Sequence, residues 1–361
     1  MTTDNAPVPR PRSPDRPHWP AEWEPHEATW IAWPHHEPDW PGKLGPIPWV
    51  YAEIVRILHR HERVEILCHD AEVEEAARRH LEAHGVRDNI RLHVVPNDRV
   101  WLRDSGGTGV LRSDGSLEWV NWRFNAWAKY DNYERDAKVG SAMATITGAP
   151  LVQPQRPDGQ GRVVLEGGAI ETDGAGTILV TEECLLSPVQ ERNPGLTREG
   201  YEQVFRDALG IDRTIWLGEG CVGDDTHGHI DDIARFVAPA VIVLAYEEDP
   251  ADDENHRRSA DNLRRLEHAG ARDGSLKVVT IPYPRAVAMS GERLPASYAN
   301  FYIANGTVIV PTFNDPTDRI ALTTLAELMP DREIVGIHAV DLVWGLGTLH
   351  CLSQQQPRAR R

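Results

Sequence analysis

The sequence predicts an α/β fold built from repeated ββαβ units, arranged as an array or as a closed ring. Four stretches each carry two apolar, β-branched runs around a tight turn, which is the pattern of a β-hairpin. A helical pattern follows each hairpin, and a further apolar strand closes each unit. The units recur about every 65 residues, and such a period is typical of arrays and rings.

The elements of the four units follow the same order along the chain. Hairpins are predicted at residues 109–122, 168–181, 233–245 and 300–311. Helices are predicted at residues 133–147, 197–209, 254–269 and 316–328. Gly210 ends the second of these helices, and Pro316 begins the fourth. The closing strands are predicted at residues 150–153, 214–217, 276–281 and 333–337.

The N-terminal part is predicted to be a fifth, irregular copy of the unit. Its strands are expected at residues 29–33, 64–68 and 90–95, and its helices at residues 49–61 and 71–84. We therefore predict a single domain over residues 19–357. A disordered arm rich in proline and arginine, residues 1–18, would precede it, and a short tail, residues 358–361, would follow it.

Composition indicates a soluble globular protein in a reducing compartment. Of the 361 residues, 40% are hydrophobic and 26% are charged, and four cysteines are too few for a disulfide framework. No stretch has the pattern of a membrane span or a secretory signal, so we expect a cytoplasmic location. The net charge of −17 disfavours nucleic acid and anionic membranes as partners and favours a cationic ligand.

The chemically reactive residues recur at one place in the repeat. Asp104 and Glu166 each precede a hairpin, and His229 and Asp231 precede the third. Cys351 follows the last closing strand, where a further hairpin would begin. In a closed ring these positions share one radius, so we expect their side chains to meet near the axis.

Cys351 lies behind Gly345, Gly347 and a histidine, a few residues from the end of the chain. Glycines allow positive φ and a close approach of the backbone to another group. We interpret Cys351 as a nucleophile delivered into a site that the rest of the chain builds. The alternative is a small buried apolar residue, which is the usual role of a free cysteine.

The stretch at residues 223–232 supplies a candidate acid and base. On an extended backbone alternate side chains share a face, so His227, His229 and Asp231 are expected to point the same way. His229 would then transfer protons, with Asp231 as a neighbouring carboxylate or a substrate ligand. The same spacing suits a zinc or manganese site, and the motif by itself leaves both interpretations open.

Two further motifs predict a pocket for a planar cation. Trp101 offers a flat apolar face and Asp104 a carboxylate, in front of two glycines. Glu166 also lies beside two glycines, and Trp127 is a candidate for an aromatic wall. A guanidinium group fits such a pocket, because two carboxylates can each bind it through paired hydrogen bonds.

These groups together predict a deimination. The thiolate of Cys351 would add to the electrophilic carbon of a guanidine, and His229 would protonate the departing ammonia. Water would then cleave the covalent adduct and release a urea. A bound cation or a protonated His229 would stabilise the thiolate, whereas neighbouring carboxylates would oppose it.

Ordered motifs run from Trp19 to Pro357. They are Trp19-Pro-Ala-Glu-Trp-Glu-Pro-His-Glu-Ala-Thr-Trp30, Trp101-Leu-Arg-Asp104, Phe124-Asn-Ala-Trp127, Leu165-Glu-Gly-Gly168, Thr181-Glu-Glu-Cys-Leu-Leu186, Arg192-Asn-Pro194, Gly228-His-Ile-Asp231, Asn300-Phe-Tyr-Ile-Ala-Asn305 and His350-Cys-Leu-Ser-Gln-Gln-Gln-Pro357. At these motifs the chain resembles the agmatine deiminase and bacterial peptidylarginine deiminase family. The resemblance implies a fivefold pseudo-symmetric α/β propeller of the pentein type. It also implies a Cys–His mechanism without a metal or another cofactor.

Carried over motif by motif, the resemblance implies that Cys351 is the nucleophile and His229 the acid and base. The residues implied to hold the guanidinium are Asp104, Glu166 and Asp231. The residues implied to line the rest of the pocket are Trp101, Trp127, Asp225 and Gly347. Asp225 would take the distal amine of agmatine.

The chain departs from the family pattern at Gly107, His227, Leu346 and Thr348. Agmatine, with two cationic ends, suits an acidic site best, and peptidyl-arginine and other guanidines stay open as substrates. Two other classes of function also stay open, a polyamine-binding module without catalysis and a metal-dependent amidinohydrolase. The ligands of the latter would be Asp224, His227, His229 and Asp231. A homodimer is a hypothesis for the assembly.

Overall fold

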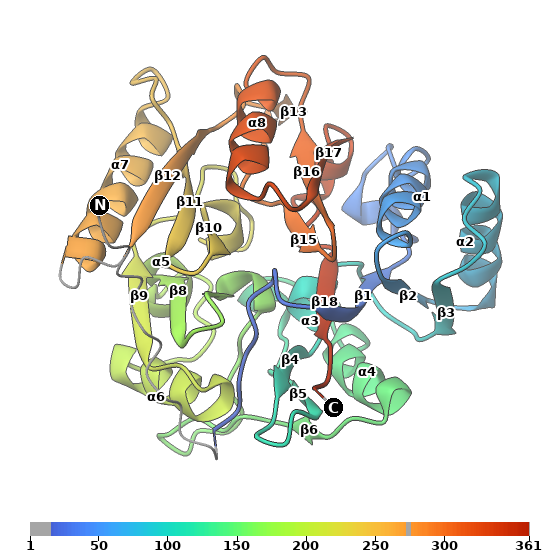
Figure 1. Cartoon of the computed structure of the whole chain (residues 1–361), viewed down its shortest axis with the longest axis horizontal. Coiled ribbons are helices and arrows are strands. Elements are labelled where there is room, and N and C mark those ends of the chain that lie inside the picture. Colours follow the sequence, from blue (N-terminus) through green and yellow to red (C-terminus); the bar gives the residue numbers. More distant parts are fainter. Residues whose placement is uncertain (1–15, 272–275, 361) are drawn as a thin grey trace, which may run out of the picture.

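Five sheets of three or four strands are arranged around the centre of the molecule (Figure 1). The computed structural model describes residues 16–271 and 276–360. In four of the sheets, two antiparallel strands are followed by a third strand that is parallel to the second. A helix connects the second strand to the third, as a parallel crossover requires. These are the predicted ββαβ units, and the α/β fold class is confirmed.

The four regular units agree closely with the predicted element order. Their strands are β4 (Thr108–Leu111), β5 (Leu117–Val120) and β6 (Leu151–Val152); β7 (Glu171–Thr172), β8 (Thr177–Thr181) and β9 (Arg213–Leu217); β10 (Ala234–Ala238), β11 (Val241–Tyr246) and β12 (Lys277–Pro282); β15 (Tyr302–Ala304), β16 (Thr307–Thr312) and β17 (Glu333–His338). Their crossover helices are α4 (Val139–Thr147), α6 (Arg198–Leu209), α7 (Asp253–Ala271) and α8 (Asp318–Leu328). A separate short hairpin consists of β13 (Ala288–Met289) and β14 (Glu292–Arg293).

Helix α6 shows why these segments are helical. The Thr197 hydroxyl caps its start by accepting the backbone N–H of Gly200 at 3.3 Å, and Gly210 ends it at φ 71°. Such a cap stabilises a helix by about 1 kcal/mol. Tyr201 and Phe205 are both fully buried, and each contributes about 1.5–3 kcal/mol by leaving water.

The fifth sheet joins the two ends of the chain. Its order is β18-β1-β2-β3, in which β18 (Ser353–Pro357) pairs antiparallel with β1 (His26–Ala32) and places Gln354 opposite Trp30. Its other elements are α1 (Ile47–Leu58), β2 (Arg63–Cys68), α2 (Ala71–Ala83) and β3 (Ile90–Val94). The β18–β1 pair stands where the other units have a hairpin. Cys351 therefore precedes the first strand of its unit, as Asp104, Glu166 and His229 precede β4, β7 and β10.

Residues on either side of the predicted domain, residues 19–357, also contact it. Residues 1–15 of the predicted arm lie outside the described residues. His18 already exchanges two backbone hydrogen bonds with Leu111, so packed chain begins before Trp19. In the tail, the backbone N–H of Arg358 donates to Pro25 O at 2.9 Å. Among the described helices, none combines the length and apolar character that crossing a membrane requires.

Candidate active site

The turn before Cys351 packs closely against the ring of Trp101. Leu346 has φ 69°, and a Cβ on Gly347 would lie 2.8 Å from the ring of Trp101 and 3.0 Å from Cys351 Cβ. Only glycine therefore fits position 347 without displacing a neighbour. The turn leaves the Cys351 side chain 6% exposed at the floor of a cavity.

Asn300 holds both this turn and the sulfur atom. Its side-chain N–H donates to Cys351 Sγ at 3.0 Å and to Asp232 Oδ1 at 2.9 Å. Its oxygen accepts the Thr348 hydroxyl at 2.7 Å and the backbone N–H of His350 at 3.0 Å. Burial and the nearby aspartates raise the pKa of the Cys351 thiol well above its usual range, whereas the hydrogen bond from Asn300 lowers it.

Replacing Asn300 with alanine is therefore expected to raise the pKa of Cys351 further and to lower kcat about 10- to 100-fold. The rate at which iodoacetamide alkylates Cys351, measured against pH, reports the pKa directly. Thr348→Val is the matched control, because it removes one hydrogen bond to Asn300 and leaves the bond to the sulfur. An unshifted alkylation profile in Asn300→Ala would contradict this role.

Asp231 lies between the thiol and the candidate acid. One of its oxygens is 3.8 Å from Cys351 Sγ, and the other is 4.0 Å from His229 Nδ1. His350 Nδ1 lies 2.7 Å from the first oxygen, and His350 Nε2 lies 2.8 Å from Glu22. Burial raises the pKa of Asp231, but the hydrogen bond to His350 and the charges of His350, His229 and Arg235 together outweigh it and hold the pKa below its usual value. Asp231 therefore keeps its charge beside the sulfur.

His229 is fully buried at the start of a single 3₁₀ turn, Ile230–Asp232. Its Nδ1 lies 3.8 Å from Asp104 Oδ1, and its Nε2 lies 3.6 Å from Glu166 Oε2. Burial favours the neutral ring, but Asp104, Cys184 and Glu166 outweigh it and raise the pKa well above its usual range. This shift favours the protonated ring of His229 at neutral pH.

Asp104 is held in the short helix α3 (Leu102–Ser105), with one hydrogen bond to each oxygen. The indole N–H of Trp127 donates to Oδ2 at 2.9 Å, and the backbone N–H of Gly168 donates to Oδ1 at 3.0 Å. Burial raises the pKa of Asp104 to about 6, against the opposing charge of His229. A Cβ on Gly168 would lie 2.5 Å from His229 Nδ1, so this glycine leaves room for the site.

Glu166 is paired with a buried arginine. Arg192 Nε donates to both carboxylate oxygens, at 3.1 and 3.3 Å, and neither side chain is exposed. Burial raises the pKa of Glu166, but Arg192 and His229 outweigh it and keep the pKa low. Because Arg192 donates to backbone oxygens at 190 and 226 as well, it joins two loops beneath the site.

The cavity above Cys351 has a volume of about 370 Å³ and acidic and aromatic walls. The predicted site residues that line it are Cys351, Asp104, Trp101, Trp127, Asp225 and Gly347. The predicted residues that lie behind this lining are His229, Glu166 and Asp231. The structure thus brings all nine predicted residues together around one cavity.

Asp225 already has two partners at this cavity. Tyr130 donates its hydroxyl to Oδ2 at 2.7 Å, and the ammonium of Lys129 forms an ion pair with Oδ1. Another carboxylate of the lining, Asp39, pairs with Arg99 at 2.7 Å. Burial raises the pKa of Asp39 to about 7, although Arg99 opposes that shift.

The expectation that His227 shares a face with His229 is wrong. The backbone at His227 has φ 65° and Gly228 has φ 91°, so the segment is a turn and not an extended strand. The His227 ring contacts the Ser187 hydroxyl at 3.0 Å instead. Asp224 accepts backbone N–H groups, among them that of His229 at 3.0 Å. Among the described residues, the four ligands of the metal-dependent alternative do not form one cluster.

The residues that depart from the family pattern lie at different places relative to the cavity. Leu346 lines the cavity, and Thr348 donates to Asn300. Gly107 packs against Trp119, 3.1 Å from where its Cβ would be, outside the cavity lining. Its main-chain oxygen accepts the side-chain N–H of Gln354 at 3.0 Å, so it supports the strand that follows Cys351.

Several residues of the site received no role from the sequence. They are Glu22, Cys184, Arg192, Asn300 and His350. All lie inside the motifs that carry the resemblance, so the motifs were the available signal. Their side-chain contacts with other residues of the site join positions from 26 to 328 apart, and no local pattern reports such pairs.

Comparison with known proteins places this arrangement in a family. The Porphyromonas-type peptidyl-arginine deiminase family matches residues 18–357 of the chain. The chain belongs to this family.

Individual proteins similar to this chain include agmatine deiminases. An agmatine deiminase of Ectopseudomonas mendocina is 36% identical over 94% of this chain and 95% of its own length. The structure of an agmatine deiminase of Enterococcus faecalis is 31% identical and superposes with a TM-score of 0.86, over 95% of this chain and 96% of that chain. An agmatine deiminase of C. jejuni is 26% identical with a TM-score of 0.83, over 96% of this chain and 98% of that chain.

Proposed function

We propose that this protein hydrolyses agmatine to N-carbamoylputrescine and ammonia. The observation that carries the proposal is the placing of Cys351 and His229 on the two oxygens of one buried carboxylate, Asp231. That arrangement holds a nucleophile and a proton donor on either side of a site for a planar cation. The relatives named agmatine deiminase cover nearly the whole chain and support the same substrate.

The substrate itself completes the activation of the thiol. In the free site burial and the aspartates favour the neutral Cys351. A guanidinium bound between Asp104, Glu166 and Asp231 brings a positive charge to the sulfur and offsets the charge of these carboxylates. The thiol then loses its proton to solvent, and the thiolate adds to the guanidine carbon, so that a C–S bond forms and a C–N double bond becomes single.

His229 moves the protons of both halves of the reaction. It donates its proton to the nitrogen that leaves as ammonia, and the C–N bond breaks to give an S-alkylthiouronium on Cys351. The neutral imidazole then takes a proton from the attacking water. The C–S bond of the tetrahedral adduct then breaks, the proton of its hydroxyl group returns to the sulfur of Cys351, and the substituted urea is left.

A direct assay tests the proposal. The protein is incubated with agmatine, free arginine and a peptidyl-arginine side by side, and ammonia, the substituted urea and free urea are measured. We expect ammonia and N-carbamoylputrescine from agmatine at the highest kcat/KM. Free urea that depends on added metal would instead indicate an amidinohydrolase, and reversible binding without turnover would indicate a polyamine-binding module.

Asp225 is proposed to bind the distal ammonium of agmatine in place of Lys129. Asp225→Asn is expected to raise KM for agmatine about 10- to 100-fold, because a charge-assisted hydrogen bond is lost. Lys129→Met is expected to lower KM, because it removes the ammonium that competes for the same carboxylate. Steady-state kinetics with agmatine, and with a guanidine that lacks the distal amine, separate the two ends. An equal loss on both substrates in Asp225→Asn would contradict this assignment.

Three broader assignments accompany the proposal. Residues 19–357 form a single deiminase domain, the protein works in the cytoplasm, and its assembly is a homodimer. All four cysteines are unpaired thiols, which supports a reducing compartment. Size-exclusion chromatography with light scattering tests the assembly, and a monomer at working concentration would reject the homodimer.

A further inference from the structure

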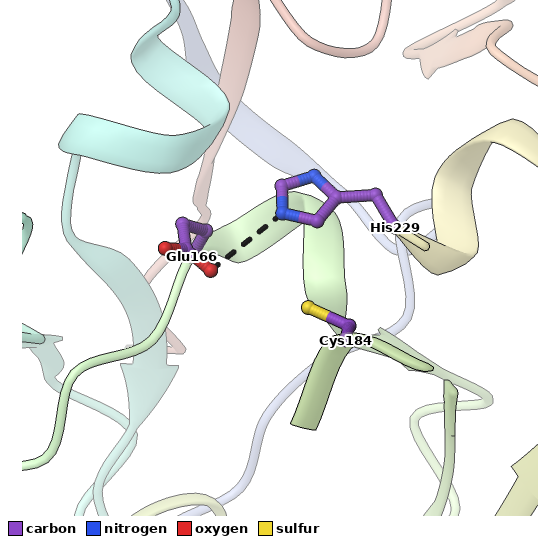
Figure 2. A group of neighbouring side chains, drawn as sticks. All are labelled: Glu166, Cys184 and His229. Carbon is purple, nitrogen blue, oxygen red and sulfur yellow. Dashed lines mark ion pairs between the residues drawn. The ribbon is translucent and has the colours of Figure 1, made fainter. Parts of the chain in front are cut away.

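A second thiol lies beneath the proposed substrate site. Glu166, Cys184 and His229 come from three separate segments, and their side chains converge on one point (Figure 2). Their nearest ligand atoms all lie within 4.8 Å of one another, and each residue is at most 1% exposed. The proposed reaction uses Glu166 and His229 but assigns no task to Cys184.

The local backbone holds Cys184 against the imidazole. Thr181 caps the short helix α5 (Glu182–Leu186) by accepting the backbone N–H of Cys184 at 3.1 Å. Neither ring nitrogen of His229 has a hydrogen bond of normal geometry to any described residue. Buried imidazole nitrogens are rarely left without a hydrogen-bond partner, and an ion bound to the ring would satisfy one of them.

The charges around this point favour a divalent cation. Asp104 and Asp231 lie 3.8 and 4.0 Å from His229, in addition to Glu166. The opposing charges are those of Arg192, which pairs with Glu166, and of Arg235 and His350, which act on Asp231. With a neutral imidazole and a thiolate the surroundings are net negative, and a metal ion is the group that stabilises both of those forms.

The donor set is one that zinc prefers. It consists of one imidazole nitrogen, one thiol sulfur and one carboxylate oxygen. Zinc lies about 2.0–2.2 Å from nitrogen and oxygen donors, so two such donors on one ion are about 3.3–3.6 Å apart. His229 Nε2 and Glu166 Oε2 are already 3.6 Å apart.

We propose that Glu166, Cys184 and His229 form an inhibitory site for Zn²⁺ or a similar thiophilic divalent ion. Binding displaces a proton from the Cys184 thiol and from the imidazolium, so His229 no longer donates to a leaving group. Glu166 turns one oxygen from the guanidinium to the ion. Zinc and substrate therefore exclude each other. The inhibition rests on the proposed deimination, whereas the binding of the ion does not.

Cobalt is a spectroscopic probe for the site, since Co²⁺ bound to a thiolate has a charge-transfer band in the near ultraviolet. We expect this band in the wild-type protein and in Cys351→Ser, its displacement by Zn²⁺, and its loss in Cys184→Ser. Cys221→Ser, which changes a buried thiol elsewhere, is the matched control and should keep the band. A band that survives in Cys184→Ser and disappears in Cys351→Ser would place the ion on the nucleophile and overturn the proposal.

A zinc soak of wild-type crystals gives a check that needs no variant. An anomalous peak is expected about 2.0–2.3 Å from His229, Glu166 and Cys184, and its absence at saturating zinc would reject the site.

Turnover measured in zinc buffers links the site to inhibition. Inhibition is measured relative to the metal-free rate of each protein. The zinc concentration for half inhibition should be at least tenfold higher in Cys184→Ser than in the wild type. In the wild type it should also rise with the concentration of agmatine. Equal inhibition of both proteins would overturn the proposal. A cobalt band without deimination of any guanidine would instead reject the proposed function and leave the metal site standing.

Discussion

Cys351→Ser is expected to lower kcat for agmatine by at least about 10⁴-fold, because a serine hydroxyl stays protonated where a thiol ionises. The substitution keeps the shape of the side chain, and Asn300 can still donate to the new oxygen. Binding of agmatine, measured by calorimetry, should therefore stay within a few-fold of the wild type. Ammonia release measures the loss of turnover.

The wild-type protein offers a complementary measurement. Quenching with acid during turnover should trap a protein species heavier by agmatine minus ammonia, with the added mass on the peptide that contains Cys351. Cys221→Ser is the control for a thiol change outside the site and is expected to retain turnover and adduct. Turnover in Cys351→Ser, or an adduct on another residue, would refute nucleophilic catalysis by Cys351.

His229→Gln is expected to lower kcat about 10²- to 10⁴-fold, the range that general acid–base catalysis contributes. The reason is specific to the departing nitrogen, which must gain a proton before it leaves. An agmatine analogue with a methylthio group in place of that nitrogen expels a thiol and depends far less on an acid. The loss in His229→Gln should therefore be much smaller for this analogue when the first half-reaction is followed in a single turnover.

The control for His229→Gln is a change to the same loop outside the site. His227 contacts Ser187 and does not line the cavity, so His227→Gln is expected to keep most of the activity. An equal loss on agmatine and on the methylthio analogue in His229→Gln would assign His229 a structural role in place of proton transfer.

Most secondary structure was predictable because it depends on neighbouring residues. The apolar spacing of 197–209 with Gly210 as a stop predicted α6 almost to the residue. Helix α4 begins later than the predicted residue 133, because residues 136–138 form a separate 3₁₀ turn instead. The pairing of β18 with β1 carried no local signal, since it joins residues at opposite ends of the sequence.

The site shows the same division. Its reactive residues stood out because they recur before the first strand of each unit, and the ββαβ order brings those positions together. The prediction for His227 failed because side chains alternate between two faces only on an extended backbone, and the φ of 65° at His227 turns its ring away from His229. The ion pair of Lys129 with Asp225 and the approach of Cys184 to His229 had no signature either, because each depends on how two separate segments of the chain pack.

The order of residues by itself determined five α/β units and the nine residues that meet in their midst, because strand periodicity, turn chemistry and motif spacing are local properties. Tertiary packing alone decided which protonation state each group favours and which residues form hydrogen bonds with one another. Burial, opposing charges and hydrogen bonds between residues far apart in the sequence favour the neutral thiol of Cys351 and the charged His229 and make the bond from Asn300. Those quantities depend on distance in space, which no local pattern in a sequence encodes.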